Sequence, residues 1–205
     1  MRQRDSLLKK NMPLKIVQKR TSHKASRRGL APLAIVIHIA EGSISSVDGW
    51  FASPASKVSA HYCVRKDGVI HQYVDEAMAA FHAGTRYAPV ARIIRQNGAT
   101  NPNFYTIGIE HEGKATDEWT AAMFEASAEL IADIALRHNI PIDADHIIPH
   151  RAIRQNKVCP GYKVDLKALI ATAQAKALIG KCKVSSASVP ATSSEADAAA
   201  ERLPS

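Results

Sequence analysis

The segment from His150 to Gly161 brings an imidazole, an amine and a thiol into one short stretch of chain. His150, Lys157 and Cys159 lie within ten residues, and Pro160-Gly161 then stops regular structure. Histidine and cysteine are the side chains that zinc prefers, and the lysine would place a cation beside the metal. The gap between His150 and Cys159 exceeds that of compact zinc modules, so the spacing alone suits an irregular loop as well.

Glu110 is a candidate for acid–base chemistry because of the strand on which we expect it to stand, over residues 105–112. Side chains alternate between the two faces of a strand. Two isoleucines therefore face a core, while Glu110 shares the opposite face with Thr106 and Gly108. A carboxylate beside a glycine suits the floor of a groove, where backbone and substrate approach closely. A solvated strand face would give the same pattern.

His38 lies at the end of an apolar, β-branched run over residues 34–39, which follows Pro32 and predicts a central strand. A polar side chain at this position lies at the rim of a core. It is either a structural residue held by hydrogen bonds or a metal ligand.

Several other elements must position these side chains. Two expected strands, over residues 58–65 and 69–74, flank Asp67-Gly68, which predicts a hairpin. Thr116 is expected to cap a helix that stops at His138, and a second helix is expected over residues 165–178. Strands interleaved with helices predict the α/β class, with a mixed central β-sheet flanked by helices in one domain.

The formal net charge of +8 is concentrated at one end, since residues 1–30 hold ten Lys or Arg and one acid. We predict a basic N-terminal arm over residues 1–29, a domain over residues 30–181, and a disordered tail rich in Ser, Ala and Pro over residues 182–205. The arm would be attracted to an anionic envelope surface. As an alternative, residues 14–17 would pack on the domain as an edge strand or a cap. The arm lacks aromatic side chains to stack on bases, so no nucleic-acid partner is expected.

No secretory signal is expected, because the apolar stretch after the first positive charges, residues 12–17, is too short and too polar. Three cysteines far apart in the sequence do not form an even disulfide framework. Both observations predict a cytoplasmic location.

Five motifs in a fixed order resemble the type 2 N-acetylmuramoyl-L-alanine amidases over about residues 33–170. They are Ile37-His38, Val58-Ser59-Ala60-His61-Tyr62 with Asp67-Gly68, Phe81-His82-Ala83-Gly84, Ile107-Gly108-Ile109-Glu110, and His150 followed by Lys157-Val158-Cys159-Pro160-Gly161. That family includes phage amidase endolysins, cytoplasmic muropeptide-recycling amidases and the peptidoglycan recognition proteins. The resemblance implies hydrolysis of the amide bond between N-acetylmuramic acid and L-alanine in peptidoglycan.

The resemblance also implies a zinc ion (Zn2+) bound by His38, His150 and Cys159, with a fourth position open to water. Many relatives carry Asp at the third position, and members that only bind peptidoglycan typically lack that ligand. The resemblance therefore favours an enzyme over a binding module. By similarity, Glu110 is the general base and Lys157 stabilises the oxyanion. Some relatives use a tyrosine as well, where this chain has Ala60.

Three further residues are expected to contact the substrate. The resemblance places His61 near the cleft. His82, in the Phe81-His82-Ala83-Gly84 loop, is expected to polarise the substrate, and Arg86 would bind a stem-peptide carboxylate through two hydrogen bonds. An ordinary solvated arginine is the alternative for Arg86. We expect a monomer that acts as a phage or prophage endolysin and reaches the cell wall after release. A cytoplasmic recycling amidase acting on anhydro-muropeptides is the alternative.

Overall fold

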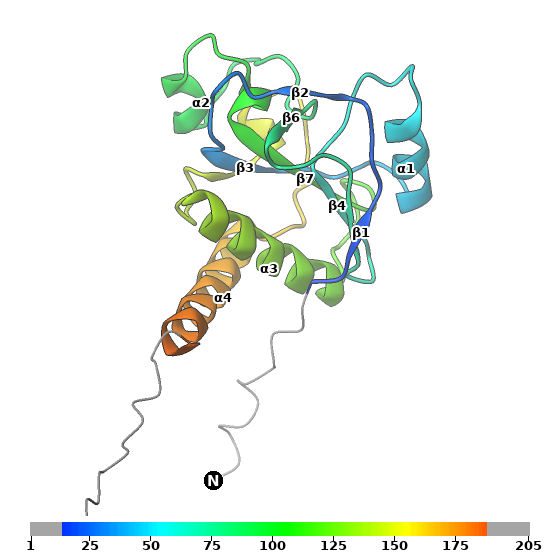
Figure 1. Cartoon of the computed structure of the whole chain (residues 1–205). Helices are drawn as coiled ribbons and strands as arrows, with labels where there is room; N and C mark the ends of the chain where they lie inside the picture. The colour runs from blue at the N-terminus through cyan, green and yellow to red at the C-terminus, as the bar shows by residue number, and fades with distance from the viewer. Residues whose placement is uncertain (1–13, 188–205) are drawn as a thin grey trace, which may run out of the picture.

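The computed structural model describes residues 14–187, whose arrangement is shown in Figure 1. The strands are β1 (Ile16–Gln18), β2 (Lys24–Ser26), β3 (Ala34–Ile37), β4 (Tyr62–Val64), β5 (Ile70–Gln72), β6 (Met78–Ala80), β7 (Thr106–His111) and β8 (Ile147–Pro149). The helices are α1 (Ile44–Ala52), α2 (Arg92–Gln96), α3 (Ala121–His138) and α4 (Leu166–Ala187), with 3-10 turns η1 (Pro102–Phe104) and η2 (His150–Ala152).

The main sheet has six strands in the order β1-β5-β4-β7-β3-β8, and β2 pairs with β6 in a separate two-stranded sheet. The β4 and β5 strands are antiparallel and form the hairpin expected around Asp67-Gly68. All other neighbours in the main sheet are parallel. The prediction of a mixed central sheet flanked by helices is confirmed.

The two faces of the sheet carry different neighbours because side chains alternate along each strand. Ile35 and Ile37 of β3 pack in one cluster with α3 and α4, which lie side by side in Figure 1. Val36 points to the opposite face, where it packs in a cluster with Ile94 of α2. The face opposite α3 therefore carries the even-numbered residues of β3 and β7.

Helix α3 begins four residues later than expected. Thr120, not Thr116, is the N-cap, and its hydroxyl accepts a hydrogen bond of 3.1 Å from the backbone N–H of Met123. At the other end Asn139 adopts a left-handed conformation with φ 54°, as expected for a chain that leaves the helix there.

The expected boundaries of the domain are corrected at both ends. Residues 14–29 belong to the domain, because β1 pairs with β5, β2 pairs with β6, and Arg27 is only 4% exposed. The Arg27 guanidinium donates to the backbone carbonyls of Glu76, Phe104 and Thr106, so one of the ten cations is structural. Helix α4 extends to Ala187, past the expected tail boundary at residue 182. The rest of the predicted arm and tail lies outside the described residues.

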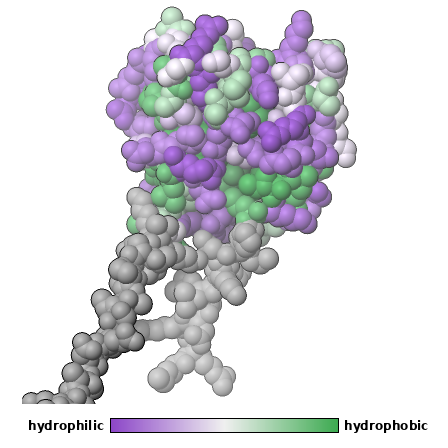
Figure 2. All heavy atoms as spheres, viewed as in Figure 1, coloured by the Kyte–Doolittle hydropathy of each residue, from purple (hydrophilic) through white to green (hydrophobic). Residues whose placement is uncertain are grey.

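The surface of the described domain is mainly hydrophilic on the face that Figure 2 shows. Hydrophobic residues gather near the lower edge of that face. None of the described helices combines the length and the hydropathy that crossing a bilayer requires.

Candidate metal centre

Three adjacent parallel strands, β7, β3 and β8, bring three polar side chains into one row. In the register of these strands, Ile37 of β3 is paired with the residues that come directly before Glu110 and His150. His38 directly follows β3, so the side chains of Glu110, His38 and His150 lie at the same level. Because neighbouring strands lie about 4.8 Å apart, residues in such a row are within contact distance.

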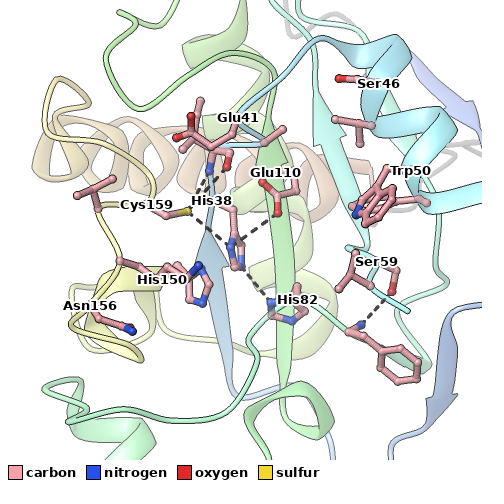
Figure 3. Close-up of a pocket in the computed structure, with 18 residues that line it drawn as sticks. His38, Glu41, Ser46, Trp50, Ser59, His82, Glu110, His150, Asn156 and Cys159 are labelled. Carbon is pink, nitrogen blue, oxygen red and sulfur yellow. Dashed lines mark hydrogen bonds and ion pairs between the residues drawn. The ribbon is translucent and has the colours of Figure 1, made fainter. Parts of the chain in front are cut away.

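A loop adds Cys159 to this row, as Figure 3 shows. The ligand atoms of His38, His150 and Cys159 all lie within 4.8 Å of one another. Cys159 Sγ is 3.8 Å from His38 Nδ1 and accepts a hydrogen bond of 3.2 Å from the backbone N–H of Ile39. The structure thus brings together the three ligands that the sequence predicted.

The loop that carries Cys159 depends on Gly161. This glycine has φ +96°, and a Cβ at its position would lie 2.4 Å from the backbone oxygen of Ala115. Arg151 holds the loop from the other side, because its backbone N–H donates to the Cys159 carbonyl and its guanidinium to the Gly161 carbonyl. Gly161 therefore allows the close approach that places the thiol.

Burial sets the protonation of the ligands. It lowers the pKa of His38 well below its usual value, with a further contribution from His150, and lowers the pKa of His150 to about 4. Both rings are neutral at pH 7, which is the form that binds a metal. Burial and the Glu110 carboxylate raise the pKa of the Cys159 thiol to about 12. A cation bound at this point would favour the thiolate.

The residues fit a zinc ion by their chemistry and by their surroundings. Each histidine ligand uses Nε2 in a hydrogen bond to the protein: His38 with Nδ1 of His82 at 3.0 Å, and His150 with the Ala83 carbonyl at 3.2 Å. One nitrogen of each ring is left for a metal. Two imidazoles and one thiol form a three-ligand set of the catalytic kind, with one coordination position open.

Glu110 lies beside this set, with Oε1 3.8 Å from His38 Nδ1. Among the described residues, Glu110 Oε2 is a buried oxygen without a hydrogen-bond partner. Burial, and to a smaller degree Glu41, raises the pKa of the Glu110 carboxyl to about 8. A buried, unpaired carboxyl oxygen beside a metal site is suited to exchanging a proton with a bound molecule.

The site opens into a cavity of about 770 Å³, a size suited to a small ligand. Its lining includes Glu110, Lys157 and Trp50 together with the three ligands. Trp50 belongs to α1, is 54% exposed, and was not predicted as a site residue. The signal in the sequence was Ser43 followed by apolar residues at 44, 47 and 51, which is the pattern of a capped helix with one buried face.

The structure argues against the predicted substrate contact by His61. The ring has no exposed surface and does not line the cavity. The backbone N–H of Gly108 donates to its Nδ1, and its Nε2 lies 3.0 Å from the Arg27 guanidinium and 3.1 Å from the Met78 carbonyl. Burial and the nearby Arg27 guanidinium lower the pKa of His61 to about 3. His61 therefore supports the sheet and stays neutral.

The other two predicted substrate contacts differ from each other. His82 lines the cavity but is only 9% exposed, and its ring is held by His38 and Thr106. Arg86 is partly buried and lies outside the cavity lining. Its contact with a stem peptide stays a prediction.

A family model described as N-acetylmuramoyl-L-alanine amidase matches residues 28–162. The N-acetylmuramoyl-L-alanine amidase A of Achromobacter lyticus is 42% identical over 110 residues, which cover 52% of this chain and 53% of that protein. The 1,6-anhydro-N-acetylmuramyl-L-alanine amidase AmpD of Salmonella typhimurium is 32% identical over 124 residues, covering 58% and 61%. The chain thus spans about half the length of the curated relatives that it matches.

Solved structures show the same architecture. The crystal structure of an AmpD derivative is similar with a TM-score of 0.64 and 26% identity, and the match covers 77% of this chain and 94% of that one. A mutant endolysin from Bacillus subtilis is similar with a TM-score of 0.53 and 21% identity, covering 80% and 99%, and shows the fold alone.

Proposed function

Because the chain belongs to the N-acetylmuramoyl-L-alanine amidase family, we propose that it hydrolyses the amide bond between N-acetylmuramic acid and L-alanine in peptidoglycan. The observation that carries this proposal is the row of Glu110, His38 and His150 across three strands, completed by Cys159. A complete ligand set beside an unpaired carboxyl oxygen favours an enzyme over a module that only binds the cell wall.

In this proposal His38, His150 and Cys159 hold one zinc ion. When bound, zinc supplies Lewis-acid chemistry, since it polarises a carbonyl and lowers the pKa of water. Glu110 takes a proton from the water that attacks the amide carbon. The carbon–nitrogen bond then breaks, and Glu110 returns this proton to the leaving amine. The products are a free lactyl carboxylate and a new L-alanine amino terminus.

Lys157 is proposed to stabilise the oxyanion that forms on the amide oxygen. It lies on the exposed rim of the cavity, two residues before Cys159. We expect Lys157→Ala to lower kcat by about 10²–10³-fold with little change in KM and full zinc content, because the interaction is made in the transition state. Lys163→Ala, which removes a lysine paired with Glu118 outside the cavity lining, should keep wild-type kcat. Equal rates in the two variants would remove Lys157 from the mechanism.

We propose the intact cell wall as the substrate, which corresponds to an endolysin. The support is electrostatic: residues 14–29 contain no Asp or Glu, and their cations other than Arg27 are exposed, namely Lys15, Lys19, Arg20, Lys24 and Arg28. The cations of the predicted arm thus lie in part on the folded domain. The recycling alternative is supported by the likeness to AmpD.

Hydrolysis of isolated sacculi and of a soluble anhydro-muropeptide separates these substrates. We expect sacculi to yield new L-alanine amino termini and no new reducing sugar ends. The rate should fall as salt is added, because salt screens the attraction between the exposed cations and the anionic wall, with a Debye length of about 8 Å at physiological ionic strength. Replacing Lys15, Arg20 and Lys24 by Gln should slow the reaction on sacculi alone. Cleavage of the soluble substrate only would indicate a recycling amidase. New reducing ends would indicate a glycosidase. No cleavage of either substrate by the zinc-loaded protein would indicate a binding module.

A further inference from the structure

The ring of His82 lies next to the predicted ligand His38 and is joined to it by a hydrogen bond (Figure 3). The hydrogen bonds of His82 have a defined direction. The Thr106 hydroxyl lies 2.7 Å from the Pro102 carbonyl and 3.2 Å from His82 Nε2. A carbonyl oxygen only accepts, and a hydroxyl has one proton to give. Thr106 therefore donates to Pro102, and its oxygen accepts from the Nε2–H of His82.

The tautomer of His82 determines the tautomer of the predicted ligand His38. A neutral imidazole has one donor and one acceptor nitrogen, so His82 with its proton on Nε2 can only accept at Nδ1. The group 3.0 Å from that nitrogen is His38 Nε2, which must then carry a proton. The Nδ1 of His38, which faces Cys159 and Glu110, is left with its lone pair. That is the tautomer a metal ligand needs.

The residue after His82 does the same for the second histidine ligand. The Ala83 carbonyl lies 3.2 Å from His150 Nε2 and can only accept, so His150 carries its proton on Nε2 and keeps the lone pair on Nδ1. Two consecutive residues, one through its side chain and one through its backbone, thus fix both imidazoles.

Hydrogen bonds from His82 and Ala83 to Asn103 hold the backbone of these two residues in place. Asn103 is 7% exposed, and its Oδ1 accepts hydrogen bonds from the backbone N–H groups of His82 at 3.1 Å and Ala83 at 2.8 Å. The His82 ring lies against Gly108, where a Cβ would come within 2.4 Å of the ring. Asn103 and Thr106, at and just after turn η1, therefore hold the backbone and the ring of this support.

We infer that Asn103 and Thr106 are positioning residues that act through His82 and Ala83 to hold both histidine ligands in their metal-binding tautomer. His82 then supports the metal site, which differs from the substrate contact predicted for it. This inference rests on the proposed zinc site. The directions of its hydrogen bonds, however, belong to the metal-free protein and can be measured there.

The first test uses nuclear magnetic resonance of the metal-free wild-type protein. Long-range proton–nitrogen correlations distinguish the two tautomers of a neutral imidazole. His38, His82 and His150 should all carry their proton on Nε2. A proton on Nδ1 of His38 or His150 would overturn the inference.

The second test compares two substitutions of Thr106 by zinc affinity, measured in competition with a chelator. Thr106→Val removes the hydroxyl at similar size and should weaken zinc binding about 10–100-fold, because outer partners of metal ligands contribute that much. Thr106→Ser keeps the hydroxyl and should bind within about threefold of wild type. The melting temperature of each metal-free variant records whether it folds.

Asn103 supplies an independent pair of variants if Thr106→Val does not fold. Asn103→Asp keeps an acceptor for both N–H groups and should retain most of the zinc affinity, while Asn103→Leu should lose it. Wild-type affinity in folded Thr106→Val and Asn103→Leu would refute the positioning role and leave the proposed function intact. A wild-type protein that binds no zinc would instead refute the proposed function.

Discussion

Cys159→Ala should lose zinc and hydrolysis together. The substitution leaves two neutral imidazoles, His38 and His150, and removes the one ligand that can bring a negative charge to the metal. We expect the measured zinc content to fall from near one ion per wild-type chain to a small fraction of that value in the variant. The release of L-alanine amino termini should fall below detection, because water activation and carbonyl polarisation both depend on the ion.

Two further cysteine variants make the result specific. Cys63→Ala changes a second free cysteine, which is buried in a separate apolar cluster, and should keep both zinc and activity. Cys159→Asp restores a charged ligand of the kind that many family members carry, and should recover zinc binding. Full activity of Cys159→Ala in excess chelator would contradict the proposed mechanism.

The parts of the fold that the sequence predicted are those defined by local signals. The β4–β5 hairpin follows from two strand-like segments around the Asp67-Gly68 turn, and β7 follows from alternation that places Glu110 on the face opposite the core. Helix α3 follows from apolar periodicity, although its start was misplaced because two threonines, Thr116 and Thr120, are each followed by residues that suit a first turn.

Of the two N-terminal strands, β1 was expected only as an alternative to a solvated arm and β2 was not predicted, because their own sequence does not define them. Strand β1 has three residues and is a strand because its backbone pairs with β5, which lies 54 residues further along the chain. Arg27 looked like one cation of a solvated arm. It is buried because carbonyls from three distant residues surround its guanidinium, and no count of charges can reveal such partners.

Without the family resemblance, the site, like the fold, was predicted only where neighbouring residues in the sequence define it. Spacing alone left His38 open to a structural role, because its neighbours Glu110 and His150 are set by the register of three strands. The family resemblance named the ligands. It also suggested a substrate contact for His61, and the structure shows instead that this ring is enclosed by backbone groups. The support from Thr106 depends on a carbonyl four residues earlier, so it becomes visible only in three dimensions.

Glu110→Gln is expected to keep zinc and lose turnover. Glutamine has nearly the shape of the carboxylate but cannot take a proton from water. General acid–base groups contribute about 10²–10⁴-fold to rates, and kcat should fall by that factor while KM changes little. Steady-state hydrolysis of a soluble muropeptide, with zinc content measured on the same sample, checks this prediction.

Glu112→Gln is the matched control because it changes the same residue type two positions along the chain. The Glu112 carboxylate accepts backbone hydrogen bonds from Ile44 and Lys66 and lies outside the cavity lining. We expect this variant to lower the melting temperature and leave kcat within a few-fold of wild type, since each lost hydrogen bond costs about 1 kcal/mol. If Glu110→Gln loses its zinc, the carboxylate is a ligand; if it keeps wild-type kcat, another group must move the proton.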